Sequence, residues 1–474
     1  MNEYQMMIGL EVHVEVKTAS KIFCGCRNVF GAEPNTHICP LCTGMPGTLP
    51  VLNRKVVERA VSAGIALNCK IAEYSEFDRK NYFYPDNPQN YQITQRFYPI
   101  CQNGYLEIET EKGTKKIGII QIHMEEDAGK LIHEKGRTLI DYNRSGVPLL
   151  EIVSSPDMEN EKEVLAYLEK LRSVLLYLGI SDCKMQEGSL RVDVNLSVCQ
   201  KGSGQTGTRT EMKNLNSFRA VSHAVIQEAA RQTAVLEAGE TVLQETRRWD
   251  EEKNCSYSMR GKEEVSDYRY FQDPDLPPVR VDREWMDQIR NRQPELRDDK
   301  IKRFEREYKI PAYDIAVLTE SPDIATLFEN TTAQGVPPKK VSNWLMGETL
   351  RLMREHRRET PGIDAKALAE LIRMNEQGRI TGSVAREVFE EMFFRGVDPI
   401  SYVEEHNLWT VQDDGELEEL VKVVIQSNPE SVRDYQNGKE KAIGFLVGQV
   451  MKNGQGRRDP IQVKNMLEKL LTNL

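Results

Sequence analysis

The sequence predicts an α+β fold, in which a mixed β-sheet with interspersed helices is followed by all-helical domains. Short alternating or β-branched runs, the pattern typical of strands, dominate from Tyr4 to about Val281. Between them lie stretches with apolar residues three and four positions apart, which is the pattern of helices. After Asp282 the strand pattern fades, and nearly every segment to Leu474 has a helical pattern interrupted at prolines.

Predicted strands and helices are interspersed along the first part of the chain. Strands are expected at residues 5–16, 105–109, 116–122, 190–198 and 208–215. Helices are expected at residues 53–67, 161–178 and 217–237. Because 474 residues exceed what one hydrophobic core usually supports, we expect separate domains at 1–292, 293–400 and 401–474.

The composition argues against several classes of protein. A net charge of −10 disfavours a wholly basic nucleic-acid-binding surface, although it is compatible with a local basic patch. No apolar run is long enough to span a bilayer, and the N-terminal residues lack the features of a signal peptide. We therefore expect a soluble, cytoplasmic protein without a membrane partner. Its nine cysteines are then expected to be metal ligands, reactive thiols or packing residues rather than disulfides.

Four of these cysteines form two close pairs, Cys24-Gly-Cys26 and Cys39-Pro-Leu-Cys42, in a loop rich in glycine and proline. Four thiolates at this spacing can complete a tetrahedral Zn²⁺ site, with His37 as an alternative ligand. Because four protein ligands leave no open coordination position, the zinc is expected to be structural. The less favoured alternative is that the four cysteines are packing residues, which is the role expected of the other five cysteines.

Acidic residues recur on three strand-like segments. Near the N-terminus, alternation places Glu11, His13 and Glu15 on one face and apolar residues on the other. Glu125 and Glu151 lie in the other two segments. Because neighbouring carboxylates repel, we infer that a cation lies on this face, and hard oxygen ligands suit Mg²⁺. The imidazole is either a ligand or a group that supports one, and a solvated acidic face is the alternative.

A segment over residues 77–89 interleaves aromatic rings with cations. It contains Arg79, Lys80, Tyr82 and Tyr84. Such a composition can stack on a nucleotide and pair with phosphate or carboxylate groups. A packed tyrosine-rich loop is the alternative interpretation.

A second polar group is expected on two neighbouring strands. Arg191, Asp193 and Asn195 share one face of the first strand because side chains repeat every two residues. Lys213 and Asn214 lie on the second strand. This combination of charged and amide groups is more typical of a phosphate-and-metal site than of a structural sheet surface.

Distinctive sequence runs occur from residue 8 to residue 452: IGLEVHVE, FDRKNYFYPD, HMEEDAGK, PLLEIVSSPD, EGSLRVDVN, EMKNLNSF, QETRRWDE, DYRYFQDPDLP, SNWLMGE and GKEKAIGFLVGQVMK. Together these runs resemble one known family, the B subunits of bacterial glutamyl/aspartyl-tRNA amidotransferases. The resemblance implies a cradle-shaped catalytic domain, a helical domain and a tail similar to the YqeY proteins.

The resemblance also implies an activity. Members use ATP to phosphorylate the side-chain carboxylate of glutamate on tRNA(Gln), and often of aspartate on tRNA(Asn), and ammonia then displaces the phosphate. The ammonia comes from a glutaminase of the amidase type, the A subunit, and a small C subunit completes a heterotrimer. The sequence does not decide which misacylated tRNA is the substrate, nor which features of the tRNA are read.

Site residues follow from the same resemblance. His13, Glu125 and Glu151 match the magnesium site of the family, with Glu11 beside it, although the sequence leaves open whether Glu125 or Glu126 is the ligand. The expected catalytic residues are Glu11, Lys80, Glu125 and Glu151, with Lys80 or Arg191 holding the phosphoryl group.

The tail is expected to contact tRNA. It contains basic residues around an apolar stripe, although an ordinary solvated face is the alternative; the candidates are Lys439, Lys441, Lys452, Arg457 and Arg458. Two other functions remain alternatives for the chain as a whole: a zinc-stabilised RNA-binding scaffold without chemistry, and a metal-dependent hydrolase that acts on a phosphoester.

Overall fold

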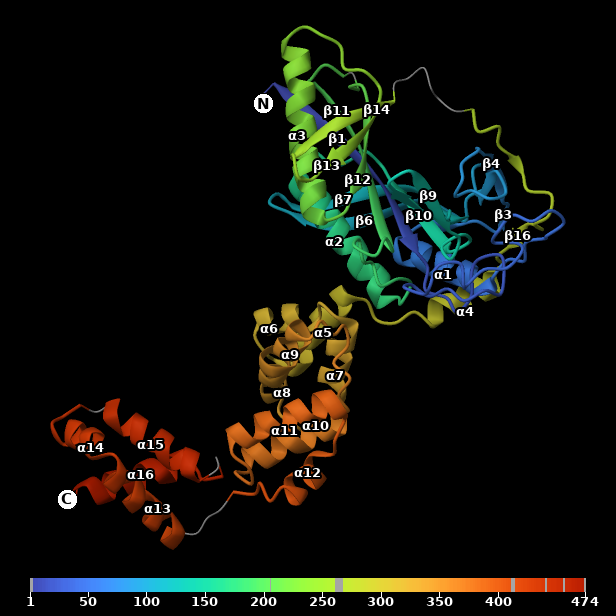
Figure 1. Cartoon of the computed structure of the whole chain (residues 1–474). Helices are drawn as coiled ribbons and strands as arrows, with labels where there is room; N and C mark the ends of the chain where they lie inside the picture. The colour runs from blue at the N-terminus through green and yellow to red at the C-terminus, as the bar shows by residue number, and fades with distance from the viewer. Residues whose placement is uncertain are drawn as a thin grey trace. The chain divides into compact units, whose positions relative to one another are not determined.

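A computed structural model describes residues 3–204, 206–260, 267–410, 414–439, 441–454 and 457–472. The chain divides into two compact units, Met1–Leu296 and Arg297–Leu474 (Figure 1). The first unit contains the sheets, and the described part of the second contains helices alone. This arrangement confirms the predicted α+β class with a helical C-terminal part.

A nine-stranded mixed sheet forms the centre of the first unit. Its strands are β1 (Tyr4–Glu15), β2 (Lys70–Ile71), β6 (Cys101–Thr110), β7 (Gly113–Glu126), β10 (Pro148–Ser154), β11 (Leu190–Gln200), β12 (Thr210–Leu215), β13 (Thr246–Asp250) and β14 (Cys255–Arg260). Their order is β14-β13-β12-β11-β1-β10-β7-β6-β2. Neighbours are antiparallel except β12 and β13, which are parallel. The N-terminal strand, β1, therefore lies at the centre.

Helices cover one face of this sheet. They are α1 (Arg54–Ala66), α2 (Glu161–Tyr177) and α3 (Phe218–Glu237), and a fourth helix, α4 (Arg283–Asn291), contacts α1. Leu10, Val12 and Val14 of β1 are buried beneath them, because alternate residues of a strand share a face. Each covering helix begins at a side-chain cap; Asn53, Asn160 and Ser217 accept a backbone N–H of the first turn. The opposite face of the sheet is left for polar side chains.

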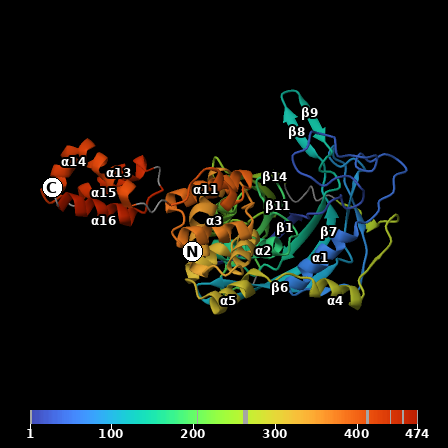
Figure 2. The ribbon, with the colours of Figure 1, turned by 90° about the horizontal axis from the view of Figure 1, so that it is seen from below.

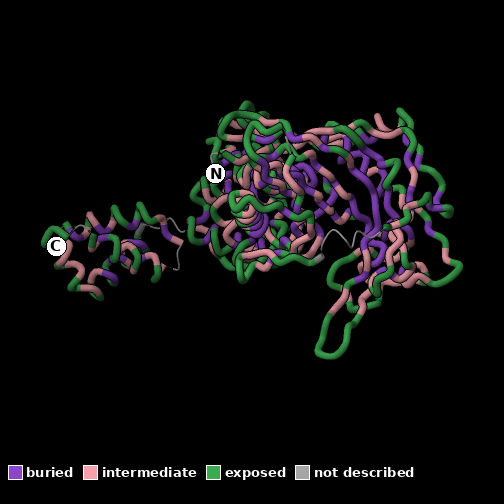
Figure 3. Tube along the Cα trace, turned by 90° about the horizontal axis from the view of Figure 1, so that it is seen from above, coloured by how far each residue is buried: buried purple, intermediate pink, exposed green. Residues whose placement is uncertain are grey.

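Three smaller sheets complete the first unit. One has the order β15-β4-β5, built from β4 (Asp78–Asn81), β5 (Tyr91–Thr94) and β15 (Phe271–Gln272). A second pairs β3 (Tyr74–Ser75) with β16 (Val279–Arg280), and a third is the hairpin of β8 (Lys130–Glu134) and β9 (Arg137–Asp141). The hairpin extends from the rest of the unit in Figure 2, and its tip is exposed in Figure 3. The first two small sheets each join segments that lie far apart in the sequence.

Two groups of helices, each with its own core, make up the second unit. The first consists of α5 (Arg297–Tyr308), α6 (Ala312–Leu318), α7 (Pro322–Thr332), α8 (Pro338–Trp344), a π-helical turn η2 (Leu345–Thr349), α9 (Leu350–Glu355), α10 (Ala365–Glu376), α11 (Gly382–Arg395) and α12 (Pro399–Glu405). The second consists of α13 (Asp414–Ser427), α14 (Pro429–Gln436), α15 (Lys441–Asn453) and α16 (Pro460–Thr472). In the described ranges no helix is long and apolar enough to cross a membrane.

The boundaries proposed from sequence fall at recognisable places. Residue 292 lies directly after α4, close to the division between the two units. Residue 400 falls inside α12, and Val403 of that helix belongs to the core formed by α5–α12. The change from one helical core to the next therefore lies after α12.

We expect the buried face of α2 to contribute strongly to the stability of the first unit. Leu175 is fully buried in the core. Leu175→Ala should lower the free energy of unfolding by about 2–5 kcal/mol, because the lost burial leaves a cavity. Leu243→Ala is the control, since Leu243 is 72% exposed and surface truncations usually change stability by less than about 0.5 kcal/mol. Chemical denaturation followed by circular dichroism measures both; equal losses would contradict this account of the core.

Candidate active site

A row of polar residues crosses four adjacent strands on the face not covered by helices. Directly opposed residues of antiparallel strands point to the same face. The register pairs Arg191 of β11 with His13 of β1, His13 with Glu151 of β10, and Glu151 with His123 of β7. Glu125 lies two residues beyond His123 and so shares its face. Strand pairing alone therefore gathers two imidazoles and two carboxylates from distant segments.

The first acidic group, formed by His13, Glu125 and Glu151, has the spacing of a metal site. His13 Nε2 lies 3.5 Å from Glu125 Oε1 and 3.4 Å from Glu151 Oε2. Ligand atoms of the three side chains lie within 4.8 Å of one another. Magnesium binds oxygen at about 2.1 Å, so that ligand atoms around one ion are roughly 3–4 Å apart. The group fits a hard divalent cation with little rearrangement.

Burial and mutual charge govern protonation in this group. Burial, together with the charge of Glu151, raises the pKa of Glu125. Burial would also raise the pKa of Glu151, but the charge and hydrogen bond of His123 and the hydrogen bond of His13 hold it well below its usual range. Burial would lower the pKa of His13, but its hydrogen bond to Glu151 and the nearby charges raise it to about 9. Two buried carboxylates this close need positive charge, which imidazolium groups or a bound cation supply.

A second acidic group lies beside the first and contains Glu11, Asp193 and Glu211, whose oxygens lie within 4.8 Å of one another. Lys213 Nζ lies 2.6 Å from Asp193 and 2.9 Å from Glu211. Asn195 Nδ2 donates to Glu11 at 2.9 Å. The sequence placed Glu11 with His13, but the register pairs Glu11 with Asp193, one row away. The structure thus brings Glu11 together with the predicted Asp193, Asn195 and Lys213.

Two predicted residues of this region point elsewhere. Asn214 is exposed and has a left-handed backbone (φ 68°), and its Nδ2 donates to the Trp249 carbonyl at 2.9 Å. It therefore does not join Lys213. Arg191 reaches along the face to Asp127, where its NH2 lies 2.9 Å from Oδ2. Arg191 is thus held next to the first acidic group by an ion pair.

Lys80 lies at the same site from the small sheet. The alternation of β4 separates it from Arg79, since neighbours in a strand face opposite sides. Thr94 of the adjacent strand donates to Glu125 at 3.4 Å, which places this face of the small sheet against the first acidic group. Burial would lower the pKa of Lys80, but the charges of Glu125 and nearby groups raise it, so that it stays cationic. Its Nζ also lies 4.9 Å from the ring centre of Tyr268.

Arg79 links two segments that lie far apart in the sequence, and its contacts with Asp273, Asp275 and Tyr91 are called the clasp below. Its Nε lies 2.7 Å from Asp273 and its NH2 lies 2.6 Å from Asp275, and its guanidinium stacks on Tyr91 with 4.1 Å to the ring centre. Asp273 is almost fully buried. These contacts join β4 to the segment after β15. The structure therefore shows Arg79 engaged in internal contacts, whereas the sequence suggested contact with substrate.

The two predicted tyrosines occupy different environments. Tyr82 is half-buried and makes an edge-to-face contact with Tyr268, with 6.4 Å between ring centres. Burial raises the pKa of Tyr82, so its hydroxyl stays protonated. Tyr84 is 53% exposed and lies in the turn that connects β4 to β5. Tyr82 is thus near the first acidic group, and Tyr84 is at the surface.

Two candidate functional residues were missed by the sequence reasoning: His123, in the first acidic group, and Lys21, beside the cysteines. His123 Nε2 lies 3.0 Å from Glu151, and the spacing His-x-Glu in β7 was the signal for it.

Alternation in β7 also distinguishes Glu125 from Glu126, which turns away and accepts from Gln89 Nε2 at 2.7 Å. Burial raises the pKa of Glu126 to about 8. Glu125 is therefore the member of the pair that joins the acidic group.

The four clustered cysteines converge as their spacing predicts. Cys42 Sγ lies 3.6 Å from Cys24 and 3.7 Å from Cys39, and the four thiols, including Cys26, form one group. Sulfurs bound to one zinc at about 2.3 Å lie about 3.8 Å apart. The hydrogen bond from Cys24 and the charge of Lys21 lower the pKa of Cys42 to about 4 despite its burial. Lys21 is fully buried, with Nζ 3.3 Å from Cys42 Sγ, and so offsets thiolate charge.

The cysteine loop packs against the connection between β4 and β5. Gly44 has a left-handed backbone (φ 65°), and a Cβ added to it would lie 2.6 Å from the Pro88 backbone. Tyr142, whose carbonyl accepts from Lys21, donates its hydroxyl to the Pro85 carbonyl at 2.9 Å. His37 lies outside the thiol group, and its backbone N–H donates to Asn143. The loop therefore supports the segment that leads from Lys80 to β5.

Basic residues of the tail have separate environments. Lys439 pairs with Asp434 at 2.9 Å, Lys441 begins α15, and Lys452 lies in its last turn. Arg458 is buried and pairs with Glu416. The structure thus places Arg458 in an internal contact and leaves the lysines at or near the surface of this helical group.

Two family profiles match the chain. The profile described as "GatB/GatE catalytic domain" matches residues 6–287, which include both acidic groups and the cysteines. The profile described as "GatB domain" matches residues 326–471. The chain belongs to the GatB family. The resemblance recognised from the sequence motifs is confirmed.

Curated relatives in this family align over nearly the whole chain. A protein of Agathobacter rectalis, named as the B subunit of aspartyl/glutamyl-tRNA(Asn/Gln) amidotransferase, is 55% identical over 99% of this chain and 100% of its own length. Proteins with the same name from Lachnoclostridium phytofermentans (53% identical, 100% of both chains) and Thermoanaerobacter sp. (55%, 99% of this chain and 100% of the relative) are similar. The GatB similarity therefore includes both units.

We expect the clasp made by Arg79 to stabilise the first unit. Arg79→Ala should lower the stability of the first unit by about 3–5 kcal/mol, because it leaves the buried Asp273 without a partner. Arg137→Ala is the matched control: its ion pair with Glu134 has the same short length (2.6 Å) but is exposed, and such pairs contribute less than about 1 kcal/mol. Chemical denaturation measures the difference, and an equally small effect of Arg79→Ala would show that the clasp contributes little.

Proposed function

We propose that the chain is the component of a tRNA-dependent amidotransferase that activates and amidates misacylated tRNA in the cytoplasm. The observation that carries the proposal is 53–55% identity, over nearly the full length, to proteins named as the B subunit of aspartyl/glutamyl-tRNA(Asn/Gln) amidotransferase. The substrates would be Glu-tRNA(Gln), Asp-tRNA(Asn) or both. A sheet face with a metal-compatible group, lysines and an arginine supports the same function.

The chemistry requires activation of a carboxylate. Ammonia cannot displace oxide from a carboxylate, whereas phosphorylation by ATP provides phosphate as a leaving group. Glu125 and Glu151, with His13 as a third ligand or a supporting group, would hold Mg²⁺, which offsets the charge that opposes attack of the carboxylate on ATP. Lys80 would direct its ammonium group at the phosphoryl oxygens. Lys213, in the second acidic group, and Arg191, next to the first, would orient phosphate.

The ammonia would come from a partner. The sequence lacks the glycine- and serine-rich signature of amidase-type enzymes, and no cysteine lies in a recognisable glutaminase setting. We propose an amidase-type A subunit as the glutaminase and a small C subunit that completes a heterotrimer. The surface lysines of the tail, Lys439, Lys441 and Lys452, would contact the tRNA backbone, whose phosphates attract cations.

The four cysteines would hold one structural Zn²⁺. Their sulfur separations suit tetrahedral coordination, and the buried Lys21 ammonium would balance part of the negative charge of four thiolates. The metal would supply folding energy to a loop that contains few buried apolar side chains. No step of the reaction would involve it.

Loss of one magnesium ligand should abolish amidation. Glu151→Gln keeps the shape of the side chain but removes its charge, so amide formation on misacylated tRNA should fall by at least ~100-fold, the equivalent of several kcal/mol. Glu107→Gln, on an exposed part of the same sheet, is the control. Single-turnover assays with the assembled complex measure both. Near-normal amidation by Glu151→Gln would refute the proposed site.

The division of labour predicts rescue by ammonium. A complex whose A subunit has lost its nucleophile should fail with glutamine but amidate tRNA when given ATP and concentrated ammonium salt at mildly alkaline pH, where neutral NH₃ is available. The Glu125→Gln, Glu151→Gln double variant should not be rescued. Glutamine-dependent amidation by this chain alone would contradict the scheme, and ATP or phosphoester hydrolysis without any amide would favour a hydrolase.

Purified protein should contain about one zinc per chain, since four thiolates form a single site. Cys39→Ser/Cys42→Ser should lose the metal and unfold at a lower temperature, whereas Cys255→Ser, outside the cluster, should keep it. Elemental analysis and thermal denaturation provide the measurements. Full zinc content in the double variant would exclude these ligands.

A further inference from the structure

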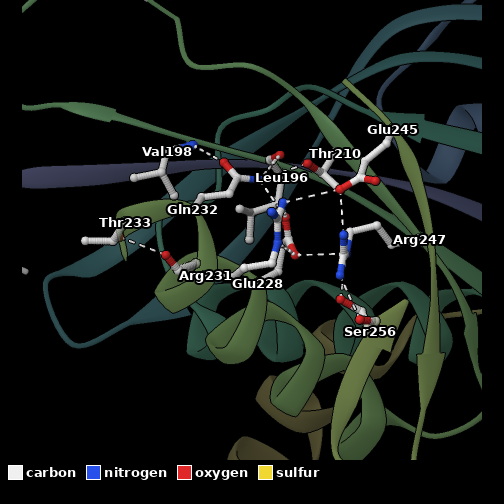
Figure 4. Close-up of polar contacts among 11 residues, drawn as sticks. Leu196, Val198, Thr210, Glu228, Arg231, Gln232, Thr233, Glu245, Arg247 and Ser256 are labelled. Carbon is white, nitrogen blue, oxygen red and sulfur yellow. Dashed lines mark hydrogen bonds and ion pairs between the residues drawn. The ribbon is translucent and has the colours of Figure 1, made fainter. Parts of the chain in front are cut away.

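A buried carboxylate lies in the middle of α3, on its sheet-facing side (Figure 4). Glu228 is 1% exposed. It accepts from Arg231 on the same helix, at 2.9 Å to Oε2 and 2.7 Å to Oε1, and Arg247 Nε of β13 lies 3.7 Å from Oε2. A buried carboxylate costs free energy unless charged partners surround it. Glu228 therefore holds two arginines in fixed positions.

Arg247 extends this network of hydrogen bonds to strands near the edge of the large sheet. Its NH1 donates to Glu245 at 2.6 Å, and its Nε and NH2 donate to the Ser256 hydroxyl and carbonyl at 2.8 and 2.7 Å (Figure 4). Glu245 and Arg247 alternate with Thr246, so Thr246 faces the other side of the sheet. There its hydroxyl donates to Glu211 Oε2 at 2.8 Å. The buried network and the second acidic group thus lie on opposite faces of one short strand.

Gln232 joins the same network to the neighbouring strands. Its Oε1 accepts from the Val198 N–H at 3.0 Å, and its Nε2 donates to Thr210, at 3.1 Å, and to Glu228, at 2.8 Å. The residue is fully buried. Through Gln232 and Glu228, one turn of α3 therefore contacts β11, β12 and β13.

The register of β13 against β12 needs contacts of this kind to fix it. It pairs with β12 in parallel over only three positions, in which Glu211, Met212 and Lys213 face Thr246, Arg247 and Arg248. A slip of one residue would move every side chain to the opposite face. Trp249 is the only buried apolar residue of this strand, so the apolar pattern specifies the register weakly. In the observed register Arg247 approaches Glu228, and Trp249, which shares the face of Arg247, is buried.

We propose that Glu228 is a positioning residue that acts through β13 on Glu211. By fixing the register, it places the Thr246 hydroxyl against the Glu211 carboxylate and so orients the second acidic group toward the substrate. The proposal rests on the proposed function, because it assigns the second acidic group a part in binding the magnesium nucleotide. Glu228 would then influence nucleotide affinity although it does not contact the second acidic group.

The test uses the assembled heterotrimer. Glu228→Gln should raise the KM for magnesium-ATP in tRNA amidation about tenfold, with a smaller change in kcat. Glu163→Gln is the matched control, because it breaks an ion pair of similar length, 2.9 Å to Lys115, between α2 and β7. Thr246→Val should reproduce the rise in KM without touching the buried network. Unchanged KM in both Glu228→Gln and Thr246→Val would overturn the proposal.

A double-mutant cycle separates positioning from general destabilisation. If Glu228 acts through Glu211, adding Glu228→Gln to Glu211→Gln should produce no further rise in KM, whereas additive effects would refute the coupling. Hydrogen exchange at the amides of Glu211–Lys213 and Thr246–Arg248 should accelerate in Glu228→Gln and stay unchanged in Glu163→Gln. If Glu211→Gln leaves ATP use unaffected, the role proposed for the second acidic group is wrong, and the exchange rates alone decide whether Glu228 fixes the strand.

Discussion

Repulsion between like charges on the open face of the nine-stranded sheet is the constraint that the first unit is built around. Glu11 and Glu151 lie on adjacent central strands, and each belongs to a group of close carboxyl or imidazole side chains. Only fixed strands can hold such groups together, because flexible side chains would separate. The apolar face of β1 beneath the helices supplies that rigidity. Cations then complete each group: His13 and His123 in one and Lys213 in the other.

Alternation in β1 can be read from the sequence, and so can the polar face that results from it. Register cannot, because pairing between β1 and β11 joins residues that no local pattern relates. For this reason the sequence groups Glu11 with His13 instead of Asp193 and gives no role to His123. The family motifs indicate Glu151 together with Glu125 or Glu126, and the pairing of β10 with β7 shows that Glu125 is the one near Glu151. The sequence therefore predicts which side chains face the site. Their division into two acidic groups can be seen only once the register of the paired strands is known.

Partners that lie far apart in the sequence also limit what can be predicted for the small sheet that contains β4. The sequence favours Arg79 as a substrate residue because its partners, Asp273 and Asp275, lie almost two hundred residues away along the chain. The cysteine cluster is easier to predict, since all four cysteines come from one short loop and their spacing in the sequence brings the thiols together. The helical second unit follows from periodicity, which is a local property. Strands β13 and β14 have no such signal, because their polar residues are stabilised by α3 and not by an alternating apolar pattern.

On the proposed function, the contact of the cysteine loop with Pro88 would make the proposed catalytic lysine sensitive to oxidants. Gly44 touches the connection that leads from Lys80 to β5, so the thiol cluster supports the position of a cation without sharing its chemistry. Oxidised thiolates no longer bind metal. Under oxidative stress the first consequence, on the proposed function, would be a folded protein with a displaced Lys80. Misacylated tRNA would then accumulate while the amount of protein stayed normal, and errors in translation would precede any loss of the enzyme.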